Sequence, residues 1–273
     1  MEQQRVAVAM KDGGVTYDQD GAVALIGLNR PTKRNALSDA IVEELRLAVL
    51  RASLEAKAGV IFGHGDHFSA GLDLAEHVER SAIEGVHHSR KWHGIFDQIA
   101  RGAIPFVSAL QGAVIGGGVE LAAATHIRVA DESVFFALPE GQRGIFVGGG
   151  GSVRVARLIS AARMADMMLT GRVLSAGEAE RANLVQYVTP RGEALGKAKA
   201  LAAQIAGNAP LSNFAIVNAL PRIQDLAHDD GLFFEALMAA MTQTSAEAQE
   251  RLRAFLEKRA DKLAMPAAAR DEG

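Results

Sequence analysis

Two glutamates set among glycines are the residues of this sequence best suited to proton transfer. Glu120 follows three consecutive glycines in the stretch GAVIGGGVELAAATH, and Glu140 stands twenty residues further on in FALPEG. Two carboxyl groups that face one site cannot easily both ionise, so their pKa values separate into an acid and a base. These residue types therefore predict an acid–base pair, provided that the fold brings them together.

The glycine triplet, Gly116 to Gly118, predicts a binding position for negative charge. It lies between a predicted buried strand, 104–110, and an alanine-rich helical segment, so backbone N–H groups and the positive end of a helix dipole converge there. The ligand is either a phosphate or an oxyanion that develops on a carbonyl during a reaction. The Lys-Ser/Thr of a P-loop is missing, and Glu120 would repel a phosphate, which favours the oxyanion.

A second glycine stretch, HFSAGLDL from His67 to Leu74, has the same order of strand, small residues, glycine and predicted helix start. It could supply a second backbone donor, or it could be an ordinary strand-to-helix connection. Glu120 also has a local alternative, because a carboxylate in the first turn of a helix complements the helix dipole without any catalytic role. Spacing in the sequence leaves both alternatives open.

The elements that must position these residues alternate between strands and helices up to about Leu195, and only helices follow. This order predicts an α/β fold with a helical C-terminal region. Ser38 is a predicted N-cap, since apolar residues recur three and four apart after it. We expect a β-hairpin of 15–17 and 22–28 with its turn at 18–21, strands at 59–62, 104–110 and 133–138, and helices from 38, at 81–100, 154–170, 175–183 and about 245–262.

Composition excludes several classes of protein. The chain has 273 residues, a formal net charge of −3 and no cysteine. The charge gives no electrostatic footprint for nucleic acid or an anionic membrane, so neither is expected as a partner. The lack of cysteine excludes disulfides, thiolate metal sites and a cysteine nucleophile. The N-terminus lacks the apolar core of a signal peptide and no apolar run is long enough to span a bilayer, so we expect a cytoplasmic protein.

Six short motifs, in their order and spacing, resemble the crotonase family of enoyl-CoA hydratases and isomerases. Each motif alone is weak, but together they cover almost the whole chain. They are LNRP (28–31) with KRNAL (33–37), FSAGLDL (68–74), GGGVELA (116–122), LPE (138–140), LTG (169–171) with SAGEA (175–179), and AFLEKR (254–259).

The resemblance implies an α/β fold, a ClpP-like spiral of ββα units in residues 1–200 that carries an acyl-CoA site, and a helical trimerisation region in residues 201–273. It implies a coenzyme A thioester as substrate, with no separate cofactor and no metal, and a role in fatty acid metabolism. It further implies a homotrimer, or a homohexamer built as a dimer of trimers.

By position in the motifs, the resemblance implies an oxyanion hole formed by the backbone N–H groups of Leu72 and Gly117. Glu120 would act on the water and Glu140 would protonate C2, with the Gly148 N–H helping to position the water. The implied reaction is the reversible syn addition of water to a 2-trans-enoyl-CoA. The implied coenzyme A and substrate contacts are Lys33, Arg34, Asn35, Ala36, Ala70, Asp73, Leu74, Phe255 and Lys258. For the cationic members of this set, ordinary solvated charge is an equal alternative.

Several positions depart from the family pattern. Ile145-Phe-Val147 stands where the family has Ile-Pro before its glycines, Thr125-His126 replaces Cys-Asp, and Asn183 takes a helix-ending glycine position. None of these removes a catalytic group, but the first bears on the loop path and on acyl-chain preference.

The histidines and aromatic residues around helix 81–100 have two possible roles. His64-x-x-His67 could begin a metal site, but no acidic residue stands at a known ligand spacing, so a structural role is expected. The helix carries Trp92 and Phe96 in the segment that shapes the acyl pocket in the family. We expect these rings in the core, at the place where substrate choice is decided.

Three functions compete. The first is 2-enoyl-CoA hydration, or in reverse 3-hydroxyacyl-CoA dehydration, which the two glutamates favour. The second is a sibling reaction on the same scaffold: double-bond isomerisation, thioester hydrolysis or decarboxylation. The third is a non-catalytic acyl-CoA-binding protein, which would gain nothing from a buried charged pair that desolvation penalises.

Overall fold

The strands of the first part of the chain form two sheets. The computed structural model describes residues 13–74 and 80–259. A six-stranded sheet has the order β1-β2-β3-β4-β6-β9, and a three-stranded sheet the order β5-β7-β8. Within these, β1 is antiparallel to β2 and β8 to β7, and the remaining pairs are parallel. The strands are β1 (Gly14–Asp20), β2 (Val23–Asn29), β3 (Ala58–Gly63), β4 (Phe106–Leu110), β5 (Ala113–Ile115), β6 (Ile127–Asp131), β7 (Phe135–Ala137), β8 (Leu174–Ser175) and β9 (Tyr187–Thr189).

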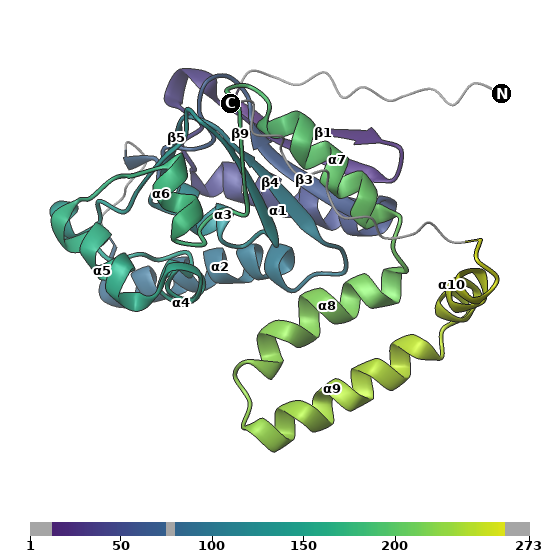
Figure 1. Ribbon diagram of the computed structural model, residues 1–273. Coiled ribbons are helices and arrows are strands. Elements are labelled where there is room, and N and C mark those ends of the chain that lie inside the picture. The colour runs from purple at the N-terminus through teal and green to yellow at the C-terminus, as the bar shows by residue number, and fades with distance from the viewer. Residues whose placement is uncertain (1–12, 75–79, 260–273) are drawn as a thin grey trace, which may run out of the picture. The chain divides into compact units, whose positions relative to one another are not determined.

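The chain passes directly from a strand of the larger sheet to a strand of the smaller one, and helices lead it back to the larger sheet. Figure 1 shows the helices α1 to α7 around the strands. β4, β5 and α3 follow one another in this way, and β6, β7 and the pair α4 and α5 repeat the pattern, which is the predicted succession of ββα units. The helices are α1 (Asp39–Glu55), α2 (Ala82–Ala100), α3 (Gly117–Ala122), α4 (Gly151–Ile159), α5 (Ala161–Thr170), α6 (Ala176–Arg181), α7 (Ala194–Ala206), α8 (Pro210–Ile223), α9 (His228–Gln243) and α10 (Ala246–Leu256), with short 3₁₀ turns at Pro31–Lys33 and Gly141–Arg143.

Two hydrophobic clusters cover the larger sheet, as a mostly parallel sheet requires. The main cluster includes the apolar face of α1, with Ile41 and Leu45, and the rings of α2. The other joins α7 to β2, β3, β4 and β6 through alanines spaced four residues apart, from Ala194 to Ala206. α7 belongs to this core, and the chain divides into two compact units after Asn218, inside α8.

The predicted hairpin is confirmed, but its turn is shorter than expected. β1 continues to Asp20 and pairs in register with β2, which leaves Gly21, at φ +59°, and Ala22 as the turn. The Ser38 N-cap is also confirmed, because the Ser38 hydroxyl accepts a hydrogen bond from the Ile41 N–H. Four short strands, β5, β6, β8 and β9, were not predicted. In the larger sheet, β6 pairs with β4, and β9 pairs with β6.

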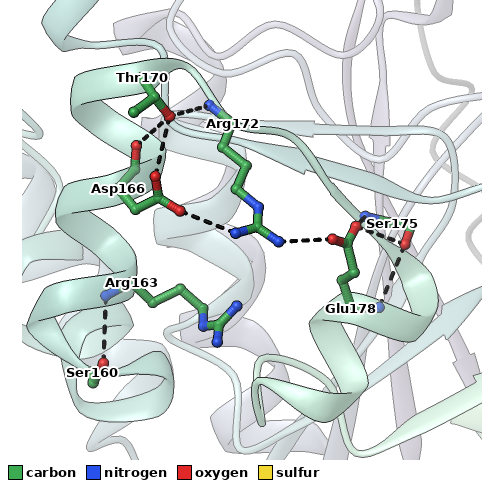
Figure 2. Close-up of polar contacts among 7 residues, drawn as sticks. All are labelled: Ser160, Arg163, Asp166, Thr170, Arg172, Ser175 and Glu178. Carbon is green, nitrogen blue, oxygen red and sulfur yellow. Dashed lines mark hydrogen bonds and ion pairs between the residues drawn. The ribbon is translucent and has the colours of Figure 1, made fainter.

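The helix predicted at 154–170 is wrong, because it is two helices that meet at Ser160. Ser160 has φ +72° and ψ +153°, which breaks the helical hydrogen bonding, and its hydroxyl accepts from the Arg163 N–H to cap α5. Figure 2 shows this cap and, at the other end of α5, Arg172 lying between Asp166 and Glu178. Arg172 binds these carboxylates at 3.2 and 2.9 Å and so joins α5 to α6.

Replacing Ser160 with glycine is expected to raise the melting temperature by roughly 2 to 4 °C. The backbone at Ser160 lies in a region that costs a non-glycine residue about 1 to 3 kcal/mol, whereas glycine at an N-cap costs only a few tenths. The matched control is Ser175→Gly, an N-cap at the ordinary φ of −74°. A lower melting temperature in both variants, measured by thermal unfolding, would contradict the strain argument.

The second unit begins at Ala219 and is described by itself. It contains the end of α8, α9 and α10. Its exposed large apolar side chains are Leu220, Leu226, Leu232, Phe233, Leu237, Met241, Leu252, Phe255 and Leu256. In the described ranges, no helix combines the length and the apolar character needed to cross a bilayer.

Candidate active site

The strand register places the two predicted backbone donors side by side. Ser69 forms a parallel bridge with Val114 in β5, in which the Ile115 N–H donates to the Ser69 carbonyl at 3.0 Å. Leu72 and Gly117 each lie three residues after a bridged residue, so the two chains leave their strands at the same edge. A Cβ built on Gly117 would lie 3.5 Å from Leu72 N, which confirms the closeness of the two N–H groups.

Both N–H groups are free to bind a ligand. Leu37 pairs with the neighbours of Leu72, because the Leu37 N–H donates to the Gly71 carbonyl at 2.7 Å and the Asp73 N–H donates to the Leu37 carbonyl at 2.9 Å. The Leu72 N–H therefore faces away from Leu37. Gly117 is the first residue of α3, where an N–H has no partner within the helix. Neither N–H has an acceptor among the residues that the structure describes.

Each glycine of the triplet meets a different close neighbour. Gly116 has φ +51°, and a Cβ there would stand 2.8 Å from Glu140 Oε1. A Cβ on Gly118 would stand 2.6 Å from the Ser69 carbonyl oxygen. Gly117 lies beside Leu72. Because the triplet has no side chains, Glu140, the Ser69 carbonyl and the Leu72 N–H can all approach the same short turn of backbone.

Glu120 is held by the glycine loop that begins α4. It is 4% exposed, and its Oε1 accepts hydrogen bonds from the Gly149 N–H at 2.8 Å and the Gly151 N–H at 2.7 Å. Burial raises the pKa of Glu120, and the donors of the loop and the charge of Arg154 offset part of that rise. We call these two hydrogen bonds, from the Gly149 and Gly151 N–H groups, the Glu120 bracket. A carboxylate that only complemented a helix dipole would not need donors from a separate loop.

Glu140 follows β7 and is buried with one oxygen unpartnered. Among the described residues its Oε2 has no hydrogen-bond partner, although the side chain is only 6% exposed. Burial, and after it the charge of Glu120, raise the pKa of Glu140 to about 7. The charge of Glu120 therefore disfavours the ionisation of Glu140, and Glu140 holds a proton readily near neutral pH.

Comparison with known proteins decides the family. The family model for enoyl-CoA hydratase/isomerase matches residues 18–264. The chain belongs to the enoyl-CoA hydratase/isomerase family. It is 37% identical over 250 residues to a candidate enoyl-CoA hydratase of Thermus thermophilus, covering 88% of this chain and 97% of that protein. It is 33% identical over 241 residues to the 2,3-dehydroadipyl-CoA hydratase of Escherichia coli, covering 87% and 93%.

A solved structure extends this likeness to three dimensions. A candidate enoyl-CoA hydratase from Rhodopseudomonas palustris matches with a TM-score of 0.87 and 53% identity, covering 90% of this chain and 95% of that one. The predicted crotonase fold is thereby confirmed.

This member of the enoyl-CoA hydratase/isomerase family fixes Glu120 with loop residues that sequence reasoning did not name. Gly149 and Gly151 donate to the carboxylate, whereas the prediction named only Gly148 of the same loop. Arg154 supports the loop, since one guanidinium nitrogen donates to the Gly149 carbonyl at 2.9 Å and the other to Asp97 at 2.6 Å. The run of glycines from 148 to 151 was the available signal.

Some of the predicted coenzyme A contacts have side chains that are already engaged. Asn35 is buried, accepts from the Arg30 N–H at 2.8 Å and donates to the carbonyls of His64 and His67 at 2.9 and 2.7 Å. Asp73 is buried and binds Arg30 at 3.1 Å and the half-exposed Lys33 at 3.4 Å. These two side chains hold the site's loops together. Of the two cations that bind Asp73, Lys33 is more exposed to solvent than Arg30.

The other predicted contacts are placed by backbone pairing or lie in the second unit. The Ala70 N–H donates to the Arg34 carbonyl at 2.8 Å, and the Ala36 carbonyl accepts from the Arg30 guanidinium at 3.0 Å. Leu74 is exposed at the end of the donor segment, and the helix start predicted after it falls at 75–79, outside the described residues. Phe255 and Lys258 are both exposed in the second unit and are described with that unit alone.

Three of the histidines singled out in the sequence contact other protein groups. His64 Nε2 lies 2.9 Å from the Thr16 hydroxyl, and His67 Nδ1 accepts from the Ala113 N–H at 3.1 Å. His126 is half-buried, its Nδ1 accepts from the Phe106 N–H, and desolvation of the ring lowers its pKa to about 4. Within 13–74 and 80–259, no three potential ligand residues form a metal-binding group. At the substituted loop, Val147 is buried and Phe146 is exposed.

Replacing Gly117 with alanine is expected to lower kcat/KM for an enoyl-CoA substrate by about 10² to 10³-fold, the usual cost of losing one oxyanion-hole donor. The added Cβ makes only ordinary contacts, at 3.5 Å from both Leu72 N and Trp92, so folding should persist. It would nevertheless stand beside the Leu72 N–H, which together with the Gly117 N–H is predicted to bind the substrate oxygen. Gly94→Ala is the matched control, because a Cβ there has no neighbour within 4 Å. Equal kcat/KM in both variants would contradict this placement of the donors.

Proposed function

We propose that the protein is an enoyl-CoA hydratase that adds water reversibly to a 2-trans-enoyl-CoA and so also dehydrates a 3-hydroxyacyl-CoA. The observation that carries the proposal is the pair of buried carboxyl groups, Glu120 and Glu140, together with two backbone donors that have no acceptor among the described residues. An isomerase or a thioester-binding protein would need one carboxyl group or none. The names of the relatives, among them a 2,3-dehydroadipyl-CoA hydratase, support the same reaction class.

In the proposed mechanism, the thioester oxygen accepts hydrogen bonds from the N–H groups of Leu72 and Gly117. Withdrawing electron density through the carbonyl makes C3 electrophilic, and the same donors stabilise the enolate that forms when oxygen adds to C3. Glu120 takes a proton from the attacking water, and Glu140 delivers its own proton to C2. Atoms balance, since one water is consumed and each carboxyl group exchanges a single proton.

The Glu120 bracket suits the base role. The Gly149 and Gly151 N–H groups both bind Oε1, so the carboxylate is oriented before substrate arrives, and Oε2 remains to hold the water. The unpartnered Glu140 Oε2 suits the donor role. The proposed chemistry needs no cofactor beyond the coenzyme A that the substrate carries, and we propose that Lys33, Arg34 and the 70–74 segment contact that group.

The test follows the loss of enoyl-thioester absorbance with the full chain and a panel of short, medium and aryl-substituted 2-enoyl-CoA thioesters. Hydration of at least one member, with a 3-hydroxyacyl-CoA product identified by mass, supports the proposal. Binding of the thioesters without any hydration would contradict it. A 3-enoyl-CoA converted to the 2-enoyl isomer without water addition would identify the sibling isomerase reaction.

We propose further that the protein assembles as a homotrimer or as a dimer of trimers. The exposed apolar side chains of α9 and α10 support this, because an interface between chains would remove their apolar area from water. Light scattering of the purified full chain distinguishes three copies, six copies and a monomer, and a monomer would contradict the proposal.

A further inference from the structure

Two rings of α2 border the candidate active site at two points. A Cβ built on Gly117 would lie 3.5 Å from Trp92 Cζ3 as well as 3.5 Å from Leu72 N, so the edge of the indole flanks the donor pair. One turn later, Phe96 Cε2 lies 3.0 Å from a Cβ built on Gly149, whose N–H binds Glu120. The rings pack edge to face with centroids 5.8 Å apart. They form one wall from the oxyanion donors to the Glu120 bracket.

Asp39 fixes the indole of Trp92 through a hydrogen bond. The indole N–H donates to Asp39 Oδ1 at 3.0 Å, and His88 Nε2 lies 2.7 Å from the same oxygen. Asp39 is the first residue of α1, two residues after Leu37, whose bridge to Leu72 orients one oxyanion donor. The segment from Leu37 to Asp39 therefore orients the Leu72 N–H and also holds the indole of Trp92.

We infer that Trp92 is a specificity-determining residue that restricts substrates to thioesters unbranched at C2, and that Asp39 is its positioning residue. The inference rests on the proposed hydration at this site. With the thioester oxygen on the donor pair and the carboxyl groups at C2 and C3, the wall runs along the first carbons of the acyl group. An unbranched chain presents only hydrogen atoms to it. A methyl group on C2 would need the space that the buried indole edge occupies.

The main test compares kcat/KM for crotonyl-CoA and 2-methylcrotonyl-CoA in wild type, Trp92→Leu and Trp92→Phe. We expect wild type to favour crotonyl-CoA and Trp92→Leu to shift the ratio at least tenfold towards the branched thioester, since one methyl group in a tight pocket is worth roughly 10 to 200-fold. Trp92→Phe, the more conservative change, should shift it less. Phe106→Leu, a buried ring in β4, is the packing control and should leave the ratio unchanged. An unchanged ratio in both Trp92 variants would overturn the inference.

Asp39 is tested by conservative rescue. Asp39→Asn keeps an oxygen that can accept from the indole N–H, whereas Asp39→Ala removes it, so we expect the alanine variant to relax the selection and the asparagine variant to retain it. A merely structural Asp39 would lower stability in Asp39→Ala without moving the selectivity ratio. That outcome would overturn the positioning role.

The fluorescence of Trp92 separates this inference from the proposed reaction, because Trp92 is the only tryptophan in the chain. Saturated butyryl-CoA cannot be hydrated, yet its binding should change the intensity or wavelength of the emission. Emission that stays constant while calorimetry reports binding would overturn the placement of Trp92. A wild type whose emission responds to butyryl-CoA but which hydrates no enoyl thioester would support that placement and contradict the hydratase function.

Discussion

Replacing Glu140 with glutamine is expected to lower kcat for the hydration of a 2-enoyl-CoA by about 10² to 10⁴-fold, the range typical of a lost proton donor. Glutamine keeps the size of the side chain and carries no charge, so it should be accepted in the buried site. Its amide cannot release a proton to C2. Loss of enoyl-thioester absorbance under saturating substrate measures the effect.

The pH dependence distinguishes a lost proton donor from lost packing. Glu140 is protonated below its pKa, which burial and Glu120 raise to about 7, and ionised above it. Activity requires the pair to hold one proton, so wild-type kcat/KM should fall as the pH rises through an apparent pKa near 7, which belongs to the coupled pair. Hydration consumes no net proton, so both directions of the reaction should share this profile. The residual activity of Glu140→Gln should lack the alkaline fall.

Glu132→Gln is the matched control, since it removes an exposed carboxyl group of the same unit. It should leave both kcat and the pH profile unchanged. If Glu140→Gln retained full hydration activity, Glu140 would not be the proton donor, and the two-carboxylate mechanism would be wrong even with the fold intact.

Replacing Glu120 with glutamine should lower kcat to a similar extent, about 10² to 10⁴-fold, because a neutral amide cannot take a proton from water. The amide oxygen can still accept from the Gly149 and Gly151 N–H groups, so the side chain should keep its orientation. The loss therefore reports on chemistry and not on a disrupted loop. Binding of butyryl-CoA should change little, which places the effect in kcat and not in KM.

The double variant sharpens this assignment. Two groups that act in one concerted addition lose most of their joint effect when either is removed. The loss of kcat in the double variant, Glu120→Gln with Glu140→Gln, should therefore be far smaller than the product of the two single losses. Multiplicative losses in kcat would indicate that the two carboxyl groups act in separate steps. A Glu120→Gln variant with unchanged melting temperature and full activity would leave Glu120 with only a structural role.

The sequence by itself determined which residue types were available and where the local elements begin. Ser38 and the apolar spacing after it predicted α1, and the Asp-Gly pair predicted the first hairpin, because capping and turn formation involve neighbours in the chain. The glycine triplet and the two glutamates similarly marked the candidate site. The motif order identified the family, and with it the fold.

Only the tertiary structure decided what these residues face. The parallel bridge between Ser69 and Val114 sets Leu72 beside Gly117, and the loop at Gly149 and Gly151 brackets Glu120 from thirty residues away. The raised pKa of Glu140 and the position of the Trp92 indole beside Gly117 also arise from contacts between distant segments. Burial, strand register and charge coupling depend on segments distant in the chain, and local periodicity carries no information about them. The break at Ser160 shows the same limit, because a helical pattern cannot reveal a backbone angle that packing imposes.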